Sequence, residues 1–313
     1  MQIATSFRIT AALLVSAPLV LGCNMHKMTA DLTAGPVRVG SIAMDREADL
    51  AFAEAAFPGS LKTIEGFLVN SPDNPDLLLV LARGYAAYAF AFLERKRDKA
   101  QFVGTEEEVE TLTRRAVVHY LRARDYAFRL LDRPELEKAA RAGDLKALER
   151  ELAEVDEEDV PALFWAVYGW GGAANLGQSD PDLAAALPVI ERMIARVVEL
   201  DPDYEHGSPL LFLGVYYAAK PTMAGGDPEK AKAYFERAMK SHGDANLLAP
   251  YLYARFYAPQ VQDRALFDRL LGQVLEANVL AHPDLRLLNE VARDLAAFWL
   301  EHADELILDA SGA

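Results

Sequence analysis

Apolar residues recur at intervals of three and four positions along almost the whole chain after residue 40. Ala, Leu, Glu and Arg dominate this part of the sequence, and no stretch shows the sustained alternation of a half-buried strand. Because a helix with one apolar stripe must bury that stripe against other helices, this period predicts an all-α fold over residues 41–313.

Several helix starts are predicted by their capping chemistry. Thr105 followed by Glu108 forms a capping-box pattern ahead of a long amphipathic segment. Three more starts place a capping acceptor before a proline at the first helical position, where the missing amide hydrogen is not needed. These pairs are Asn74 with Pro75, Asp180 with Pro181, and Asp227 with Pro228.

The predicted helices come in pairs with a tetratricopeptide-like pattern, in which large residues on one helix fit beside small residues on its partner. The best copy comprises Leu210, Leu213, Gly214 and Tyr217, then Ala231, Phe235 and Ala238, with residues 221–226 as an enlarged loop. Fainter copies comprise Ile64, Phe67, Leu78, Leu81, Ala82 and Tyr85, and Ile190, Ile194 and Val197. The pattern predicts stacked helix pairs, an α-solenoid-like bundle, with a concave face or groove suited to binding.

The N-terminus resembles a bacterial lipoprotein signal. Residues 11–21 are apolar, Arg8 precedes them, and Val20, Leu21, Gly22 and Cys23 resemble a lipobox. Residues 1–22 are therefore predicted to be a signal peptide, and Cys23 the lipidated first residue of the mature chain. An ordinary cleaved signal and an uncleaved anchor are the alternatives. The apolar segment is short for a membrane-crossing helix, which needs about 20 residues.

Residues 23–40 are predicted to be the lipidated cysteine and a tether, because Gly35, Pro36 and Gly40 interrupt any helical period. Asn24 follows the cysteine, and in enterobacterial-type sorting this favours the outer membrane. The expected location is the cell envelope of a bacterium, with the body anchored by lipid and facing the periplasm.

The charge balance excludes two classes of partner. Removing residues 1–22 takes away Arg8 and no acid, which changes the formal charge from −15 to −16. Nucleic acids and anionic membrane surfaces both need clustered Lys and Arg, so neither is expected as a partner, and membrane contact is expected through the lipid only. Cys23 is the only cysteine, so an intramolecular disulfide is excluded.

No catalytic set is found in the sequence. The six histidines have no metal-ligand spacing, and nucleophile-elbow and phosphate-loop motifs are absent. The acidic residues between 151 and 159 lack the spacing of a calcium loop and indicate a solvated face with a helix boundary. We therefore expect no metal, no cofactor and no enzyme activity.

Aromatic side chains are the candidates for a ligand or partner groove, and the alternative is that most of them are core residues at helical spacing. Trp165, Tyr168 and Trp170 fall within six residues and cannot all face one side of a helix, so at least one is expected to point into a groove or interface. The candidate set is Tyr85, Tyr88, Trp165, Tyr168, Trp170, Tyr216 and Tyr217.

Small and polar residues in the same apolar helices have structural interpretations. Gly171 and Gly172 are expected to allow a close contact between helices. Asn175 and Asn289 are expected to bridge helices by hydrogen bonds, since an unpaired buried amide would be costly.

Four stretches together resemble a known family, the T component (TatT) associated with tripartite ATP-independent periplasmic (TRAP) transporters. They are GYAAYAFAFLE at residues 84–94, WGGAANLG at 170–177, GSPLLFLGVYYAAKP at 207–221 with GGD at 225–227, and DRALFDRLL at 263–271 followed by LNEVA at 288–292. The resemblance implies an envelope lipoprotein that assists the solute-binding protein of a TRAP transporter. It further implies a homo-trimer with a ligand-accessible cavity, through which an apolar or organic-acid solute passes between the two proteins.

The leading hypothesis is a lipid-anchored helical protein that pairs with a TRAP solute-binding protein. One alternative is a tetratricopeptide lipoprotein that acts as a scaffold for envelope or outer-membrane assembly. Another is a stand-alone carrier of a hydrophobic ligand.

Overall fold

The computed structural model describes residues 25–220 and 222–307, and within these ranges the chain is helical with no strand. The predicted all-α class is therefore confirmed. The signal peptide and Cys23 lie outside the described residues, so their predicted roles stay predictions. Pro221, at the start of the predicted 221–226 loop, lies outside them too.

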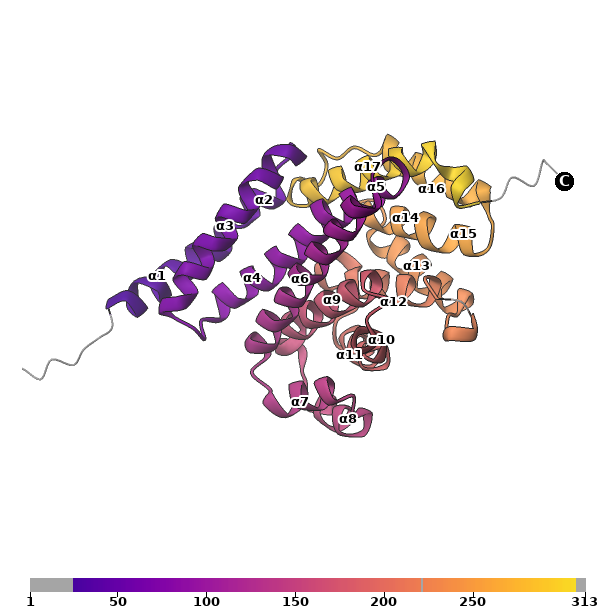
Figure 1. Cartoon of the computed structure of the whole chain (residues 1–313). Helices are drawn as coiled ribbons and strands as arrows, with labels where there is room; N and C mark the ends of the chain where they lie inside the picture. Colours follow the sequence, from indigo (N-terminus) through magenta and orange to yellow (C-terminus); the bar gives the residue numbers. More distant parts are fainter. Residues whose placement is uncertain (1–24, 221, 308–313) are drawn as a thin grey trace, which may run out of the picture.

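The helices of the N-terminal half begin with a pair that projects from the molecule. Figure 1 shows α1 and α3 side by side at one edge, and α4 and α6 next to them. Their bounds are α1 Met25–Gly40, α2 Ile42–Asp45, α3 Leu50–Asn70, α4 Pro75–Tyr88, the π-helix η1 Ala89–Glu94, α5 Arg95–Val103, α6 Glu106–Leu131, α7 Pro134–Ala142, α8 Leu145–Ala153 and the 3-10 turn η2 Glu157–Asp159.

The second half continues as packed helices, and α14 to α17 gather near the C-terminal end (Figure 1). The bounds are α9 Val160–Leu176, α10 Pro181–Ala185, α11 Leu187–Leu200, α12 Tyr204–Ala218, η3 Thr222–Ala224, α13 Pro228–His242, α14 Leu248–Leu252, the π-helix η4 Tyr253–Tyr257, α15 Ala258–Gln260, α16 Arg264–Glu276, η5 Pro283–Leu285, α17 Arg286–Glu301 and η6 Ala303–Glu305.

The predicted helix starts are found where the capping residues place them. The Thr105 hydroxyl accepts a hydrogen bond from the Glu108 amide at 3.2 Å, although the reciprocal bond of a full capping box is not formed within the described residues. Asn74 accepts from Leu77 N, Asp180 from Asp182 N, and Asp227 from Lys230 N. Each of these three caps precedes a proline in the first turn, as predicted.

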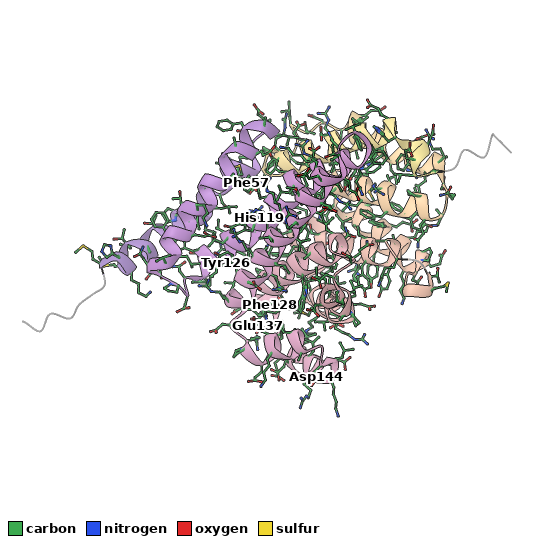
Figure 2. The ribbon with its side chains drawn as sticks, viewed as in Figure 1. Phe57, His119, Tyr126, Phe128, Glu137 and Asp144 are labelled. Carbon is green, nitrogen blue, oxygen red and sulfur yellow. The ribbon has the colours of Figure 1, made fainter. Side chains whose placement is uncertain are left out.

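The tetratricopeptide-like pairing is clearest between α12 and α13. A Cβ added to Gly214 would lie 2.8 Å from the Phe235 ring, so the large ring packs directly on the glycine. Extensive contacts also join α6 to α9 and α4 to α6, and α3 packs on α4. Stacked helix pairs therefore form one continuous core, and Figure 2 shows Phe57, His119 and Tyr126 within the layer made by α3, α4 and α6.

The structure differs from the predicted tether. Residues 25–40 form helix α1, with Pro36 inside it, instead of an irregular linker. Ala30 and Ala34 are buried against the adjacent helices, and α1 contacts both α3 and α4. The small size of these alanines permits the close approach, and it also hid the helical period in the sequence.

One continuous helical segment, Pro75–Val103, is long and apolar enough to cross a bilayer by length and composition alone. However, 67% of its most apolar window is buried inside the fold. The segment is therefore packed as a core helix, in line with its contacts to α3, α6 and α9.

Candidate ligand cavity

A cavity of about 720 Å³ lies between the packed helices. Its walls come from the α4–η1 segment, α9, α12, the α14–η4 segment and α17, with the α1–α3 region on one side. Most of the lining side chains are apolar or aromatic, including Phe90, Phe164, Phe212 and Phe256. Concave, mainly apolar sites with a few polar groups are typical of small-molecule binding.

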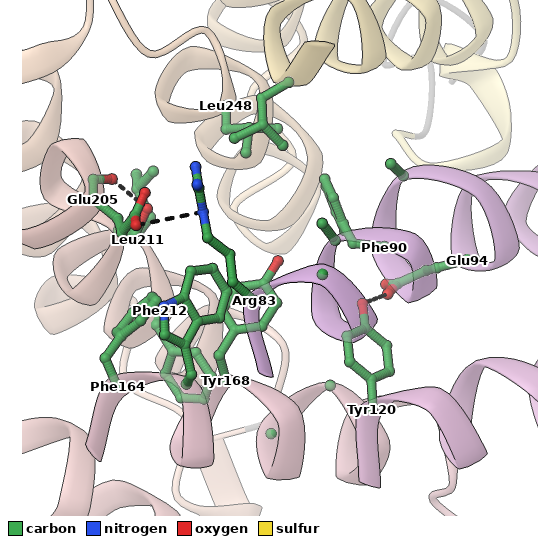
Figure 3. A pocket seen from close by; sticks show the side chains of 18 of the residues that line it. Arg83, Phe90, Glu94, Tyr120, Phe164, Tyr168, Glu205, Leu211, Phe212 and Leu248 are labelled. Atoms are coloured by element: carbon green, nitrogen blue, oxygen red, sulfur yellow. Dashed lines mark hydrogen bonds and ion pairs between the residues drawn. The ribbon is translucent and has the colours of Figure 1, made fainter. Parts of the chain in front are cut away.

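One wall of the cavity is a single helical face. Arg83, Ala87, Phe90, Ala91 and Glu94 all border the cavity, and their spacing repeats about every turn. Arg83 and Glu94 are eleven positions apart, which corresponds to roughly 16 Å along the helix. Figure 3 shows Phe90 between the two charged residues. The wall therefore has an ionic group near each end and an apolar stretch between them.

Both π-helical segments of the described chain contribute to this cavity, η1 through Phe90 and Glu94 and η4 through Phe256. A π-segment holds one extra residue per turn, which shifts the faces on which the following side chains lie. Such segments are frequent at functional sites.

Two glycines of α9 bring aromatic rings close to its backbone. A Cβ on Gly171 would lie 2.3 Å from the Phe212 ring, and a Cβ on Gly172 would lie 2.7 Å from the Tyr120 ring. The predicted close helix contact at these glycines is therefore confirmed, and it forms part of the cavity wall.

Arg83 is held between two carboxylates at the cavity. It lies 3.0 Å from the Asp45 carboxylate. It also lies 3.6 Å from the Glu205 carboxylate (Figure 3). Burial raises the pKa of the Asp45 carboxyl above its ordinary value, although the Arg83 charge opposes the shift. Glu205 has a left-handed backbone with φ 45°, which is unfavourable for a residue with a side chain. Arg83 is thus already neutralised by its neighbours.

Glu94 is an enclosed acid whose remaining accessible surface borders the cavity. Its carboxylate accepts a hydrogen bond from the Tyr120 hydroxyl (Figure 3). Burial raises the pKa of Glu94 to about 7, and the negative charge of Asp98 adds to this shift. At neutral pH this carboxyl can therefore act as a donor or as an acceptor.

Lys220 borders the cavity from the segment after α12. Its ammonium lies over the Tyr216 ring at 3.3 Å from the ring centroid. Burial lowers the pKa of Lys220, and the Glu191 charge opposes the shift. Among the described residues no carboxylate lies within ion-pair distance of this ammonium, in contrast to Arg83 and to Arg95, which pairs with Asp294 at 2.7 Å.

The structure places three of the seven candidate aromatics at the cavity: Trp165, Tyr168 and Tyr216. The Trp165 indole nitrogen donates to the Tyr204 hydroxyl at 3.2 Å. The Tyr216 hydroxyl is bonded to Leu187 O at 3.2 Å and to Glu191 at 3.1 Å. Within the described chain the Tyr168 hydroxyl has no hydrogen-bond partner, so it is available to a ligand.

The other four candidates lie in the packed core and do not line this cavity. Tyr85 stacks on His119 and Tyr126, and Tyr88 packs against Phe57 and Phe92. Trp170 lies on the opposite side of α9, where it meets Phe128 and the Arg124 guanidinium. Tyr217 donates to Glu191 at 2.7 Å. As expected, Trp165, Tyr168 and Trp170 do not share one side of α9.

The two asparagines differ in their surroundings. Asn289 accepts from Leu247 N at 3.0 Å and donates to Ala245 O at 2.9 Å. It therefore has the predicted structural hydrogen bonds, although they join α17 to the segment before α14 and not to another helix. Asn175 instead borders the cavity.

No group of three or more metal-ligating side chains is found among the described residues. Burial, with the neighbouring Arg122 and Arg115 charges, lowers the pKa of the half-buried His119 to about 4. His242 lies 2.9 Å from Asp203, and His302 stacks on Phe298. The histidines with partners described here therefore have structural environments.

Sequence reasoning missed Arg83, Glu94 and Lys220 as cavity residues. Two signals were available. Arg83 directly precedes the aromatic stretch 84–94 that carries the family resemblance and Glu94 ends it, and Lys220 follows the tyrosine pair in the stretch 207–221. Their charges did not distinguish them from surface residues.

Comparisons with known proteins agree with the helical architecture. The family model described as TRAP transporter T-component matches residues 46–307. A curated protein of Treponema pallidum (strain Nichols), named only as an uncharacterized protein, is 27% identical over 97% of this chain and 99% of its own length.

Proposed function

This chain belongs to the TRAP transporter T-component family, and we propose that it is a lipid-anchored partner of a TRAP solute-binding protein that helps bind or hand over a solute. Family membership indicates a transport-associated, non-enzymatic role in or near the bacterial envelope. Attachment through Cys23 to the outer membrane, a body facing the periplasm, a homo-trimer and solute transfer are the finer parts of the proposal.

The observation that carries the proposal is the apolar cavity of about 720 Å³. A volume of this size suits a small organic molecule. The wall between Arg83 and Glu94 is apolar over about two helical turns, which favours a solute with an elongated apolar body.

Lys220 is the residue that we propose to recognise an organic acid. Arg83 and Arg95 already pair with carboxylates of the protein, so an acidic solute would have to displace those partners. Lys220 lies against an aromatic ring, and a solute carboxylate would give its partly buried ammonium an ionic partner. The solute class is therefore an amphipathic carboxylate, with its apolar part among the aromatic residues of α9 and α12.

Binding of decanoate and decanol to the purified protein tests this class. In Lys220→Met we expect the affinity for decanoate to fall by roughly tenfold, because a charge-assisted contact contributes about 1.5 kcal/mol or more. Decanol binding should be unchanged. Lys232→Met is the matched control, because it removes a positive charge on α13 that does not line the cavity and lies 4.0 Å from the Glu236 carboxylate. An equal loss of decanoate and decanol affinity in Lys220→Met, or no binding of either compound to the wild-type protein, would contradict the proposed solute class.

Co-purification tests the partner. The acylated full chain should recover a TRAP solute-binding protein from envelope extracts, and Cys23→Ser should leave helicity intact while the protein leaves the membrane fraction. Recovery of envelope-assembly factors alone would favour the scaffold alternative. A retained apolar ligand in the purified protein, with no binding-protein partner, would favour the stand-alone carrier.

A further inference from the structure

Helix α1 carries an apolar stripe on its outer face. Met25, Met28, Leu32 and Val39 follow one another at helical spacing and fall within roughly 60° around the helix axis. Their exposed fractions are 71%, 53%, 71% and 74%. Single exposed apolar residues are ordinary, but four on one face of a helix form a continuous unpartnered stripe.

The opposite face of α1 fixes the direction of this stripe. Ala30 and Ala34 are buried against the neighbouring helices. The Asp31 carboxylate accepts hydrogen bonds from Ser71 and Asn74 in the turn before α4, and Arg38 pairs with Asp76 at 2.8 Å. The helix is therefore held firmly on the body, and the stripe cannot turn inward without breaking these contacts.

Charge does not explain the exposed face. Lys27 pairs with Asp31 and Arg38 pairs with Asp76, so the basic residues of α1 are neutralised by carboxylates of the protein. The chain as a whole is acidic, with a formal charge of −15. Any surface that covers the stripe must therefore be recognised through apolar contact, and not through anionic groups.

The position of α1 in the chain favours one occupant. Met25, the first residue of α1, lies two positions after Cys23, which is the predicted acylated residue. Two residues span about 7 Å at most, so acyl chains on Cys23 would hold the start of the stripe at the membrane surface. Four side chains on one helix expose much less than the ~800 Å² per partner of a standard protein interface, which makes a second copy of the chain a poorer fit.

We propose that α1 lies flat in the interface of a phospholipid membrane, with Met25, Met28, Leu32 and Val39 at the boundary between headgroups and acyl chains. This inference rests on the lipid anchor of the proposed function, and it departs from the expectation that the lipid alone contacts the membrane. The acyl chains supply the affinity, and the stripe sets how the body stands on the membrane. Because α1 is fixed to α3 and α4, one orientation follows for the whole helical body.

A fluorophore at position 32 tests the contact. Cys23 is the only cysteine, and acylation consumes its thiol, so Leu32→Cys gives a single labelling site in the acylated full chain. An environment-sensitive NBD label there should show blue-shifted emission and quenching by spin-labelled lipid in phosphatidylcholine vesicles. Lys138→Cys is the matched control, because Lys138 is 77% exposed on α7, away from α1. Its label should keep the emission of a label in water.

A second experiment tests whether the contact between α1 and the membrane is apolar. Adding phosphatidylglycerol to the vesicles or raising the salt concentration should leave the blue shift of the NBD emission at position 32 unchanged. Introducing Met28→Glu into the labelled protein should abolish the shift while the acylated protein stays on the vesicles. Met28 is half-exposed, so this change leaves the fold intact.

Three results would overturn the inference. Vesicle-bound, acylated protein whose label at position 32 behaves like the label at position 138 would refute it and leave the lipid anchor standing. Protein that carries no acyl mass and does not float with vesicles would refute both. The same test covers a second copy of the chain. If the label at position 32 of the non-acylated chain shows blue-shifted emission that grows with protein concentration in the absence of vesicles, the stripe is a contact between copies of the chain.

Discussion

Two glutamates of this protein accept hydrogen bonds from tyrosine hydroxyls, yet their pKa values shift in opposite directions. Glu65 on α3 accepts from Tyr85 at 2.5 Å and from Tyr126 at 2.9 Å. Glu94 at the end of η1 accepts from Tyr120. The pKa of Glu65 is lowered, whereas that of Glu94 is raised to about 7.

The surroundings explain the difference. Burial raises the pKa of Glu65, but hydrogen bonds from Lys62, Tyr85 and Tyr126 outweigh it. At Glu94 burial is the largest effect, the Asp98 charge acts in the same direction, and the Tyr120 hydroxyl is a smaller opposing influence. A tyrosine donor is thus not enough to keep a carboxylate charged. The Glu65 site ties α3, α4 and α6 together as a fixed anion, whereas the Glu94 site can change its charge beside the cavity.

The largest expected effect concerns Glu94. Its folded-state pKa lies above the unfolded value of about 4.3, so the stabilising protonated form is lost as the pH rises through 7. Relative to Glu94→Gln, which mimics the neutral carboxyl, the wild-type free energy of unfolding should fall by on the order of 3 kcal/mol between pH 5 and pH 8.

Urea unfolding of both proteins at several pH values measures this difference. The two should differ least at pH 5, and the variant should be clearly the more stable at pH 8. If the difference between them does not change over this range, Glu94 titrates as an ordinary exposed acid and the comparison with Glu65 fails.

A second effect acts through Tyr120. In Gly172→Ala the new methyl group would lie 2.7 Å from the Tyr120 ring, so the ring that donates to Glu94 must move. Overpacking of this kind typically costs about 1–3 kcal/mol. Gly66→Ala is the control beside Glu65, since no atom lies within 4 Å of a Cβ there. It should raise the free energy of unfolding by about 0.5–1 kcal/mol through helix propensity. Thermal and urea unfolding of the two variants should show a lower free energy of unfolding for Gly172→Ala and a higher one for Gly66→Ala.

A third, smaller effect is expected for Glu65→Gln. The lowered pKa means that the charged form stabilises the fold above the unfolded value, and this contribution is lost as the pH falls below about 4.3. We expect the variant to be about 1 kcal/mol less stable at pH 7, because its partly solvated site screens the interaction. The deficit should shrink at pH 3 in acid-unfolding measurements. A deficit that persists there would mean that geometry and not charge is lost.

The sequence predicted the parts of the fold that depend on local chemistry. Thr105 and Asp227 begin helices because their side chains accept amide hydrogens within the next turn. Gly214 and Phe235 identify their helix pair because ring size and the missing Cβ match locally. In α1, by contrast, Gly35 and Pro36 look like helix breakers, yet the segment is helical and buries Ala30 and Ala34 in tertiary contacts that the local sequence does not reveal.

The candidate site was less predictable, because a cavity depends on contacts distant in the chain. Spacing within α9 predicted that Trp165, Tyr168 and Trp170 cannot all face one side, but which side is hollow depends on how α12 and α14 pack there. The position of Glu94 depends on η1, whose π-helical geometry changes the phase of the helix. No residue pattern within the stretch indicated that change.

The smallest stability effect, and the sharpest test of the cavity, is expected for Tyr168→Phe. Burial raises the pKa of the Tyr168 hydroxyl, which has no hydrogen-bond partner within the described chain, unlike the Tyr120 hydroxyl on Glu94. Its removal should change the free energy of unfolding by less than about 0.5 kcal/mol. If the hydroxyl instead serves a bound solute, decanoate and decanol affinities should both fall by about two- to tenfold, as expected for one hydrogen bond. Unfolding and binding measured on the same preparation separate the two quantities. A clear stability loss with unchanged binding would place Tyr168 with Tyr85 and Tyr126 as a structural residue.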